Sequence, residues 1–136
     1  MRSDSSIPYN SNINLEGVNL DNQIHPTGFP PLTGEILTDI IQRIAVNNQV
    51  KKIILFGSYA GLSCEPTSDS DIDLLVIMET SLPRAEKILT ITHLLRPRPF
   101  PMDILVRTPE EITEMMESGN VFFNEVMIQG KVLFER

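Results

Sequence analysis

We predict a mixed α/β (α+β) domain for this chain of 136 residues, from three observations in its sequence. Apolar residues recur at helical spacing in several segments. Short apolar runs of strand length alternate with those segments, and Pro, Gly and polar clusters separate the two kinds. This alternation predicts a small mixed sheet flanked by helices.

Residues 1–32 differ in composition from the rest of the chain. They are rich in Asn and Ser and close with Pro26, Pro30 and Pro31, and neither a helical nor a strand period runs through them. Segments of this kind bury too little apolar surface to order on their own. We therefore expect residues 1–32 to form a flexible N-terminal arm, or a segment that becomes ordered on a partner, and residues 33–136 to form one folded domain.

The first helix is expected from Leu32 onward, where one apolar stripe appears, and it ends at Asn47 and Asn48. The stripe consists of Ile36, Leu37, Ile40, Ile41, Ile44 and Ala45. A second helix begins at Pro83, because Pro suits a first helical position, and ends at the Arg-Pro repeat over residues 96–99.

Two further helices follow. The motif Thr108-Pro109-Glu110-Glu111 matches a capping box and starts one of them. The other covers residues 121–128. Two side-chain pairs in these helices are interpreted as core or partner interface rather than as a cofactor site: Met115 with Met116, and Phe122 with Phe123.

Four short apolar runs predict the strands of the sheet. They cover residues 51–56, 71–78, 102–106 and 131–134. Strand side chains alternate between faces, so the second run has two faces of different character. One face consists of Ile72, Leu74, Val76 and Met78, and the other of Asp71, Asp73, Leu75 and Ile77.

The formal net charge of −7 argues against a protein that binds the phosphates of nucleic acid, because such proteins have Lys and Arg clustered on one face. The 11 basic residues of this chain are scattered. An acidic protein that handles a polyanionic substrate needs another source of positive charge, and bound metal is the simplest one.

The remaining composition points to a cytoplasmic protein. No apolar run approaches the ~20 residues that span a bilayer, and the N-terminus has no apolar stretch typical of a signal peptide. The single cysteine, Cys64, excludes an intramolecular disulfide and is interpreted as a bystander in a polar loop.

Asp71 and Asp73 are candidate metal ligands, because they lie on one face at the start of the second strand. Two carboxylates at such a short distance repel one another unless a cation lies between them. Oxygen ligands at this spacing suit Mg²⁺. The alternative is that they lie at a solvated strand end and cap a turn with Asp69.

Asp103 and Gly57-Ser58 complete the candidate site. Asp103 is a lone acid in an apolar strand, so it either joins the two carboxylates from a neighbouring strand or faces water on an edge strand. Gly57-Ser58 directly follows a buried strand, where its backbone can approach a ligand and its N–H groups can bind an anion. An ordinary turn is the alternative.

Four features follow one another along the chain. They are Phe56-Gly57-Ser58-Tyr59-Ala60, the segment from Asp69 to Val76, Asp103, and a closing segment from Gly130 to Phe134. The combination resembles the minimal nucleotidyltransferase (MNT) domains of the DNA polymerase β superfamily, in particular the antitoxins of HEPN–MNT toxin–antitoxin pairs. The resemblance covers residues 33–136 and implies a polymerase-β-like nucleotidyltransferase fold.

Two departures from the family accompany the resemblance. The loop between Ser58 and Asp71 is two residues longer than usual, which costs little entropy. Gly61-Leu62 stands where an Arg commonly follows Tyr-Ala, so one contact to phosphate is missing.

The resemblance also implies a mechanism and a partner. Gly57 and Ser58 hold the triphosphate of ATP, and Asp71, Asp73 and Asp103 bind two Mg²⁺ ions. The acceptor hydroxyl attacks the α-phosphorus, pyrophosphate leaves, and Asp103 receives or orients the acceptor's proton. In HEPN–MNT pairs the acceptor is a tyrosine of the toxin, and the added AMP silences a ribonuclease.

We therefore expect a hetero-oligomer with a HEPN-type toxin and no direct contact with nucleic acid or membrane. The size of the chain favours an acceptor carried by a partner, because roughly a hundred residues build only the catalytic sheet and its helices. Two alternatives remain: an antitoxin that neutralises its toxin by binding alone, and a stand-alone enzyme that adenylylates a small molecule.

Overall fold

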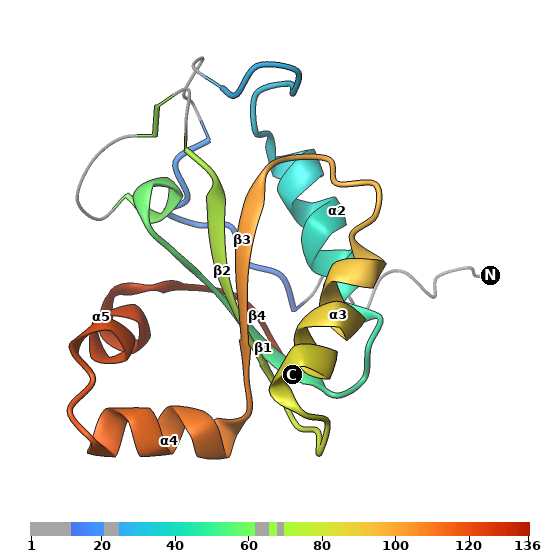
Figure 1. Cartoon of the computed structure of the whole chain (residues 1–136). Helices are drawn as coiled ribbons and strands as arrows, with labels where there is room; N and C mark the ends of the chain where they lie inside the picture. The colour runs from blue at the N-terminus through green and yellow to red at the C-terminus, as the bar shows by residue number, and fades with distance from the viewer. Residues whose placement is uncertain (1–11, 21–24, 62–65, 68–69) are drawn as a thin grey trace.

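A computed structural model describes residues 12–20, 25–61, 66–67 and 70–136 (Figure 1). Cys64 and Asp69 lie outside these ranges. The elements are α2 (Gly34–Ala45), β1 (Val50–Phe56), the 3-10 helix η2 (Ser58–Ala60), β2 (Ile72–Met78), α3 (Arg84–Leu94), β3 (Met102–Arg107), α4 (Pro109–Glu117), α5 (Val121–Gln129) and β4 (Lys131–Glu135).

The four strands form one mixed sheet in the order β3-β2-β1-β4. β1 pairs antiparallel with β2 and with β4, while β2 pairs parallel with β3 through the crossover helix α3. Helices cover both faces of the sheet, α2 and α3 on one and α4 and α5 on the other (Figure 1). The predicted mixed α/β fold is therefore confirmed.

The face beneath α2 and α3 carries the larger core. The apolar stripe of α2 packs there, and Leu37, Ile40, Ile41 and Ile44 are completely buried. β2 contributes alternate residues to the same core, namely Ile72, Leu74, Val76 and Met78. The alternation predicted for this strand is confirmed, and it directs the remaining residues of β2 to the other face.

The face beneath α4 and α5 carries a smaller core. Its buried members are Ile54, Leu75, Ile77, Ile112, Phe123 and Val126, with Phe56 and Leu105 partly buried against them. These helices cover only part of the sheet, because both are short and they follow β3 at its carboxyl end. The amino ends of β2 and β3 lie beyond them.

The helices on either side of β3 are joined by an ion pair whose lysine is buried. Lys87 of α3 is only 3% exposed, and its ammonium lies 3.2 Å from the carboxylate of Glu111 in α4. The side chain of Glu111 also accepts a hydrogen bond from the backbone N–H of Thr108, which completes the predicted capping box. This contact anchors the carboxyl end of β3.

Helix α3 begins one residue later than predicted. Pro83 is its N-cap, in an extended conformation, and the first helical residue is Arg84. The missing N–H of Pro costs nothing at either position, so the sequence signal does not distinguish them. None of the helices among the described residues combines the length and apolar content that a membrane crossing requires.

The N-terminal segment differs from the expected flexible arm. Ile13 forms an antiparallel bridge with Phe134 of β4, and the N–H of Asn14 donates to the carbonyl of Leu133 at 2.8 Å. Apolar side chains of this segment pack against the larger core, namely Ile13, Leu15, Val18, Leu20, Phe29 and Leu32.

For residues 12–20 and 25–32 the expectation of a flexible arm was therefore wrong. The anchoring residues are spaced irregularly, because the segment runs across the domain as an extended chain, and a search for helical or strand periods overlooks them. Residues 1–11 and 21–24 lie outside the described ranges. The domain boundary at residue 33 stays a prediction.

Candidate active site

The sheet places two of the three predicted carboxylates side by side. Asp73 of β2 is the direct partner of Asp103 in the parallel register of β3, and Phe56 at the end of β1 is the partner of Asp73 on the other side. Asp71 immediately precedes β2 and is exposed. The structure thus brings Asp71, Asp73 and Asp103 to one end of the sheet, on the face that α4 and α5 only partly cover.

Both interpretations of Asp103 from the sequence hold in part. β3 is an edge strand among the described strands, and Asp103 is exposed. Asp103 nevertheless lies on the same sheet face as Asp73, because directly paired residues point to the same side. An acid on an open edge, adjacent to a second acid, is accessible to substrate and still within its partner's electric field.

The pKa of Asp73 is strongly perturbed. Burial first, then the neighbouring charges of Asp103 and of Asp71, together raise its pKa from the ordinary 3.8 to about 6. A half-buried carboxylate between two like charges is stabilised either by a proton or by a cation. Such carboxyl groups are common at functional sites.

Gly57 lies directly against the carboxyl group of Asp73. Its backbone adopts φ 79° and ψ −157°, a region open almost only to Gly. A Cβ at this position would collide with Oδ2 of Asp73. Gly is therefore required at position 57 for two reasons. Its backbone conformation is nearly restricted to Gly, and a side chain would prevent the close approach of the backbone to the carboxylate.

Ser58 and Tyr59 continue from Gly57 into η2. Ser58 opens this single turn, in which the N–H of Ala60 donates to the carbonyl of Gly57 at 3.1 Å. Tyr59 is buried, and its ring packs edge-on against Phe100 at 5.8 Å. Burial and then the charge of Asp71 raise the pKa of the Tyr59 hydroxyl.

The N-terminal segment also contacts this loop, which the sequence analysis missed. The N–H of Asn19 donates to the carbonyl of Tyr59 at 2.9 Å. No local pattern in the sequence predicts this hydrogen bond, because it joins two irregular segments that are far apart in the chain. The segment thereby supports the turn that holds Gly57 and Ser58 in place.

The carboxylates have the chemistry of a site for a hard cation. Mg²⁺ prefers carboxylate oxygens together with water and phosphate, and a cation would relieve the mutual repulsion at Asp73. In the described part of the chain, however, no three His, Cys, Asp or Glu side chains form a ready-made metal-binding group. The residues fit a cation by donor type and charge, and the three-carboxylate ligand set stays a prediction.

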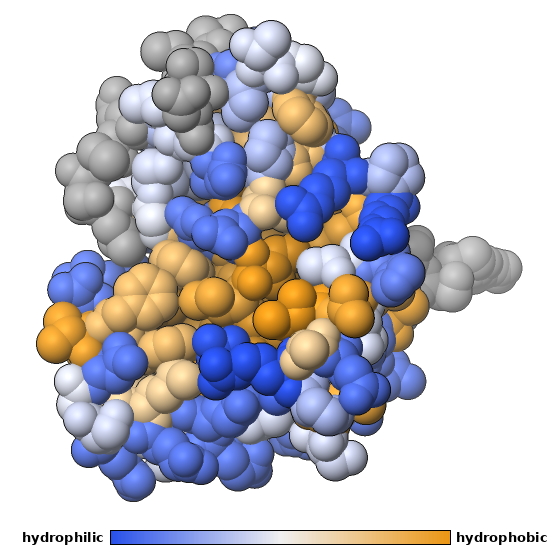
Figure 2. Space-filling model, viewed as in Figure 1, coloured by the Kyte–Doolittle hydropathy of each residue, from blue (hydrophilic) through white to orange (hydrophobic). Residues whose placement is uncertain are grey.

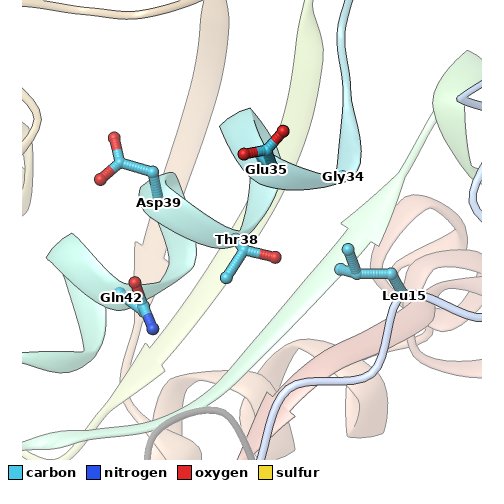
Figure 3. Close-up of a pocket in the computed structure, with 6 residues that line it drawn as sticks. All are labelled: Leu15, Gly34, Glu35, Thr38, Asp39 and Gln42. Atoms are coloured by element: carbon cyan, nitrogen blue, oxygen red, sulfur yellow. The ribbon is translucent and has the colours of Figure 1, made fainter. Parts of the chain in front are cut away.

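A separate pocket of about 590 Å³ lies elsewhere on the domain. Figure 3 shows that it lies between Leu15 of the N-terminal segment and α2, which contributes Gly34, Glu35, Thr38, Asp39 and Gln42. Because α2 covers the sheet face opposite to Asp73, this pocket does not belong to the carboxylate site. Its only charged lining residues are two acids, which do not suit a phosphate ligand.

Comparison with known proteins places this geometry in a family. No match was found among curated proteins. Among solved structures, a "putative nucleotidyltransferase" from Sulfolobus solfataricus is similar, with a TM-score of 0.53 and 16% identity over 75% of this chain and 79% of that chain. At this identity the likeness shows the fold alone. The family described as "Polymerase beta, Nucleotidyltransferase" matches residues 38–136, which include all five predicted site residues. The chain therefore belongs to the polymerase beta nucleotidyltransferase family.

Proposed function

We propose that this chain is a Mg²⁺-dependent nucleotidyltransferase that transfers AMP from ATP to a tyrosine hydroxyl of a partner HEPN ribonuclease toxin, and so acts as an antitoxin. Membership of the family supports nucleotidyl transfer in general. The observation that carries the proposal is the direct pairing of Asp73 with Asp103, with the backbone of Gly57 against the carboxyl group of Asp73.

Each residue of the site has a role in this proposal. Asp71, Asp73 and Asp103 would hold Mg²⁺, which supplies positive charge for the triphosphate and for the pyrophosphate that leaves. Gly57 and Ser58 bring backbone close to the phosphates. The acceptor oxygen forms a bond to the α-phosphorus as the bond to the β-phosphate oxygen breaks. The exposed Asp103 takes the hydroxyl proton.

Two observations support an acceptor as large as a protein. Asp103 is exposed on the edge strand β3, so a side chain presented by another protein can reach it from solvent. The segments Phe56 to Ala60 and Asp69 to Val76 resemble those of antitoxins whose acceptor is a tyrosine of a HEPN toxin.

The net charge of −7 is consistent with metal, rather than Lys and Arg, as the counter-charge for ATP.

The test is the intact mass of a co-expressed HEPN-type toxin after incubation of the two proteins with Mg-ATP. We expect a gain of one or more AMP units with the wild-type chain and none with the double variant Asp71→Ala/Asp73→Ala. Asp39→Ala is the matched control, because this acid lies on α2, on the opposite face of the sheet, and its loss leaves the site intact.

An unchanged mass with the wild-type chain, in a complex that still forms, would contradict the transfer and favour neutralisation by binding alone. Release of pyrophosphate with a small-molecule acceptor and no protein partner would instead indicate a stand-alone adenylyltransferase.

A further inference from the structure

An exposed apolar surface lies at the first turn of α5 and contacts Phe56, the cross-strand partner of Asp73. Phe122 is 48% exposed and Val121 is 71% exposed, although both are apolar. Figure 2, viewed as Figure 1, shows apolar surface over α5 that continues toward the front edge of the sheet, with hydrophilic surface above and below it. Phe123, in contrast, is buried in the smaller core.

Two neighbouring rings pack almost perpendicular to Phe122 and hold it in place. Its ring packs almost perpendicular to Phe56, with centroids 5.6 Å apart at 86°. It packs in the same way against Phe123, at 5.3 Å and 89°. Edge-to-face packing fixes the orientation of a ring while leaving part of its surface accessible. Phe122 is thus an ordered aromatic platform open to solvent.

Phe56 connects this platform to the carboxylates. It is the cross-strand partner of Asp73 and immediately precedes Gly57. Neighbouring strands are about 4.8 Å apart, so Asp103, Asp73 and Phe56 form a continuous row across one sheet face, and the ring of Phe122 contacts the last member of that row, Phe56. One surface therefore has a charged end and, next to it, a flat apolar end.

A nucleotide has the same two ends, a phosphate chain and a flat heteroaromatic base. We propose that Phe122 is the stacking platform for the base of the nucleotide bound at the carboxylates, which rests on the proposed function above. Phe123 belongs to the core as predicted. Phe122 is too exposed for the core, and its interpretation as a partner interface stays a prediction.

The neighbours of Phe122 also indicate what the platform selects. Two polar side chains beside it each make one hydrogen bond within the helix. Asn120 accepts from the N–H of Phe123 at 3.1 Å, and Asn124 donates to the carbonyl of Asn120 at 2.8 Å. Stacking without hydrogen bonds to the base edge depends on ring area rather than on the pattern of donors and acceptors. A stack on Phe122 is therefore expected to bind purine nucleotides more tightly than pyrimidine nucleotides.

The experiment measures dissociation constants by isothermal titration calorimetry on the whole chain, with Mg²⁺ and no acceptor. The probes are ATP, GTP, UTP and inorganic tripolyphosphate, which has no base. We expect Phe122→Ala to weaken ATP and GTP about tenfold, in the range of a lost aromatic stack. Tripolyphosphate should bind as before, and Phe122→Tyr should retain wild-type affinity for ATP.

Ile128→Ala is the matched control. Ile128 is the last residue but one of the same helix and is 76% exposed, so its truncation removes apolar surface without removing an aromatic ring. We expect all four affinities to be unchanged in this variant. Circular dichroism of each variant establishes that α5 is still folded.

Three results would overturn the inference. If Phe122→Ala binds ATP as tightly as the wild-type chain, the base does not stack there, and the proposed transfer activity is untouched. If Phe122→Ala also weakens tripolyphosphate, the residue acts on the structure of the site. If the wild-type chain fails to bind Mg-ATP at all, the proposed function fails with it.

Discussion

The two faces of the sheet are built from the same strands but differ in how completely helices cover them. The face under α2 and α3 is closed, and the residues of β2 that point into it are fully buried. The face under α4 and α5 is closed at Leu75 and Ile77 but open at Asp73, two residues earlier on the same side of the same strand.

Along β2, the side chains that stabilise the fold therefore differ from the side chain that a ligand can reach. Apolar burial on the closed face holds β2 rigidly, and the short helices on the other face leave its first carboxylate half-buried. A carboxyl group in that position is perturbed enough to need a proton or a cation, and it is still accessible to ligand. Rigid strands also position functional groups more accurately than loops do.

The largest expected effect contrasts the two faces directly. Leu74 and Leu75 are adjacent and both completely buried, but they point into different cores. Truncation of either to Ala should destabilise the protein by about 2–5 kcal/mol. Leu74→Ala should cost more, because the small core around Leu75 has partly exposed neighbours that can move into the cavity. Urea denaturation of both variants measures the difference.

Equal losses in the two variants, or a larger loss for Leu75→Ala, would show that the second face is packed as tightly as the first. The contrast between a closed and an adaptable face would then be wrong.

A smaller effect tests how Gly57 supports the open face. Gly57→Ala should cost about 1–3 kcal/mol, because the backbone lies in a region that is nearly restricted to Gly. It should also weaken Mg²⁺ binding by about 10–100-fold, as the loss of a supporting contact typically does, because the new Cβ displaces the carboxyl group of Asp73. Thermal unfolding and a Mg²⁺ titration measure the two effects.

Gly119→Ala is the control for Gly57→Ala. Gly119 has a similar φ of 80°, but a Cβ there would meet no atom within 4 Å. We expect a loss of stability with unchanged Mg²⁺ binding. If the two variants bound Mg²⁺ equally well, the contact between Gly57 and Asp73 would have no role in the site.

The smallest effect is the pH dependence of the metal-free protein. The folded chain holds a proton on Asp73 up to a pH of about 6, whereas the unfolded chain releases it near 3.8. The stability that this group contributes is therefore complete below pH 3.8 and is lost as the pH rises through about 6. Asp103→Asn should reduce this loss and raise the Tm at pH 8 in EDTA by a few degrees, because it removes a neighbouring like charge.

Burial, the larger cause of the shift, remains in Asp103→Asn, so part of the pH dependence should persist. Glu114→Gln, at an exposed acid of α4, is the matched control and should leave the pH dependence as it is. Identical curves for Asp103→Asn and the wild-type chain would mean that the two paired carboxylates do not interact.

Most of the fold follows from local patterns. The stripe of α2, the capping box of α4 and the alternation in β2 are all local, because each depends on residues within one or two turns of a helix or along one strand. The same alternation predicts that Asp71 and Asp73 share a face with Leu75 and Ile77. These features could be predicted because the backbone period alone determines which side chains share a side.

Other features were decided only by tertiary structure. The pairing of Asp73 with Asp103 depends on which strand lies beside β2, and the parallel crossover through α3 determines this. Residues 12–20 have no period, yet they bridge to β4 and support the turn at Tyr59. Long-range partners, burial and the resulting pKa of Asp73 arise from the sum of contacts between distant segments. The sequence alone determined the elements and the candidate residues, and the packing of those elements decided how the residues meet.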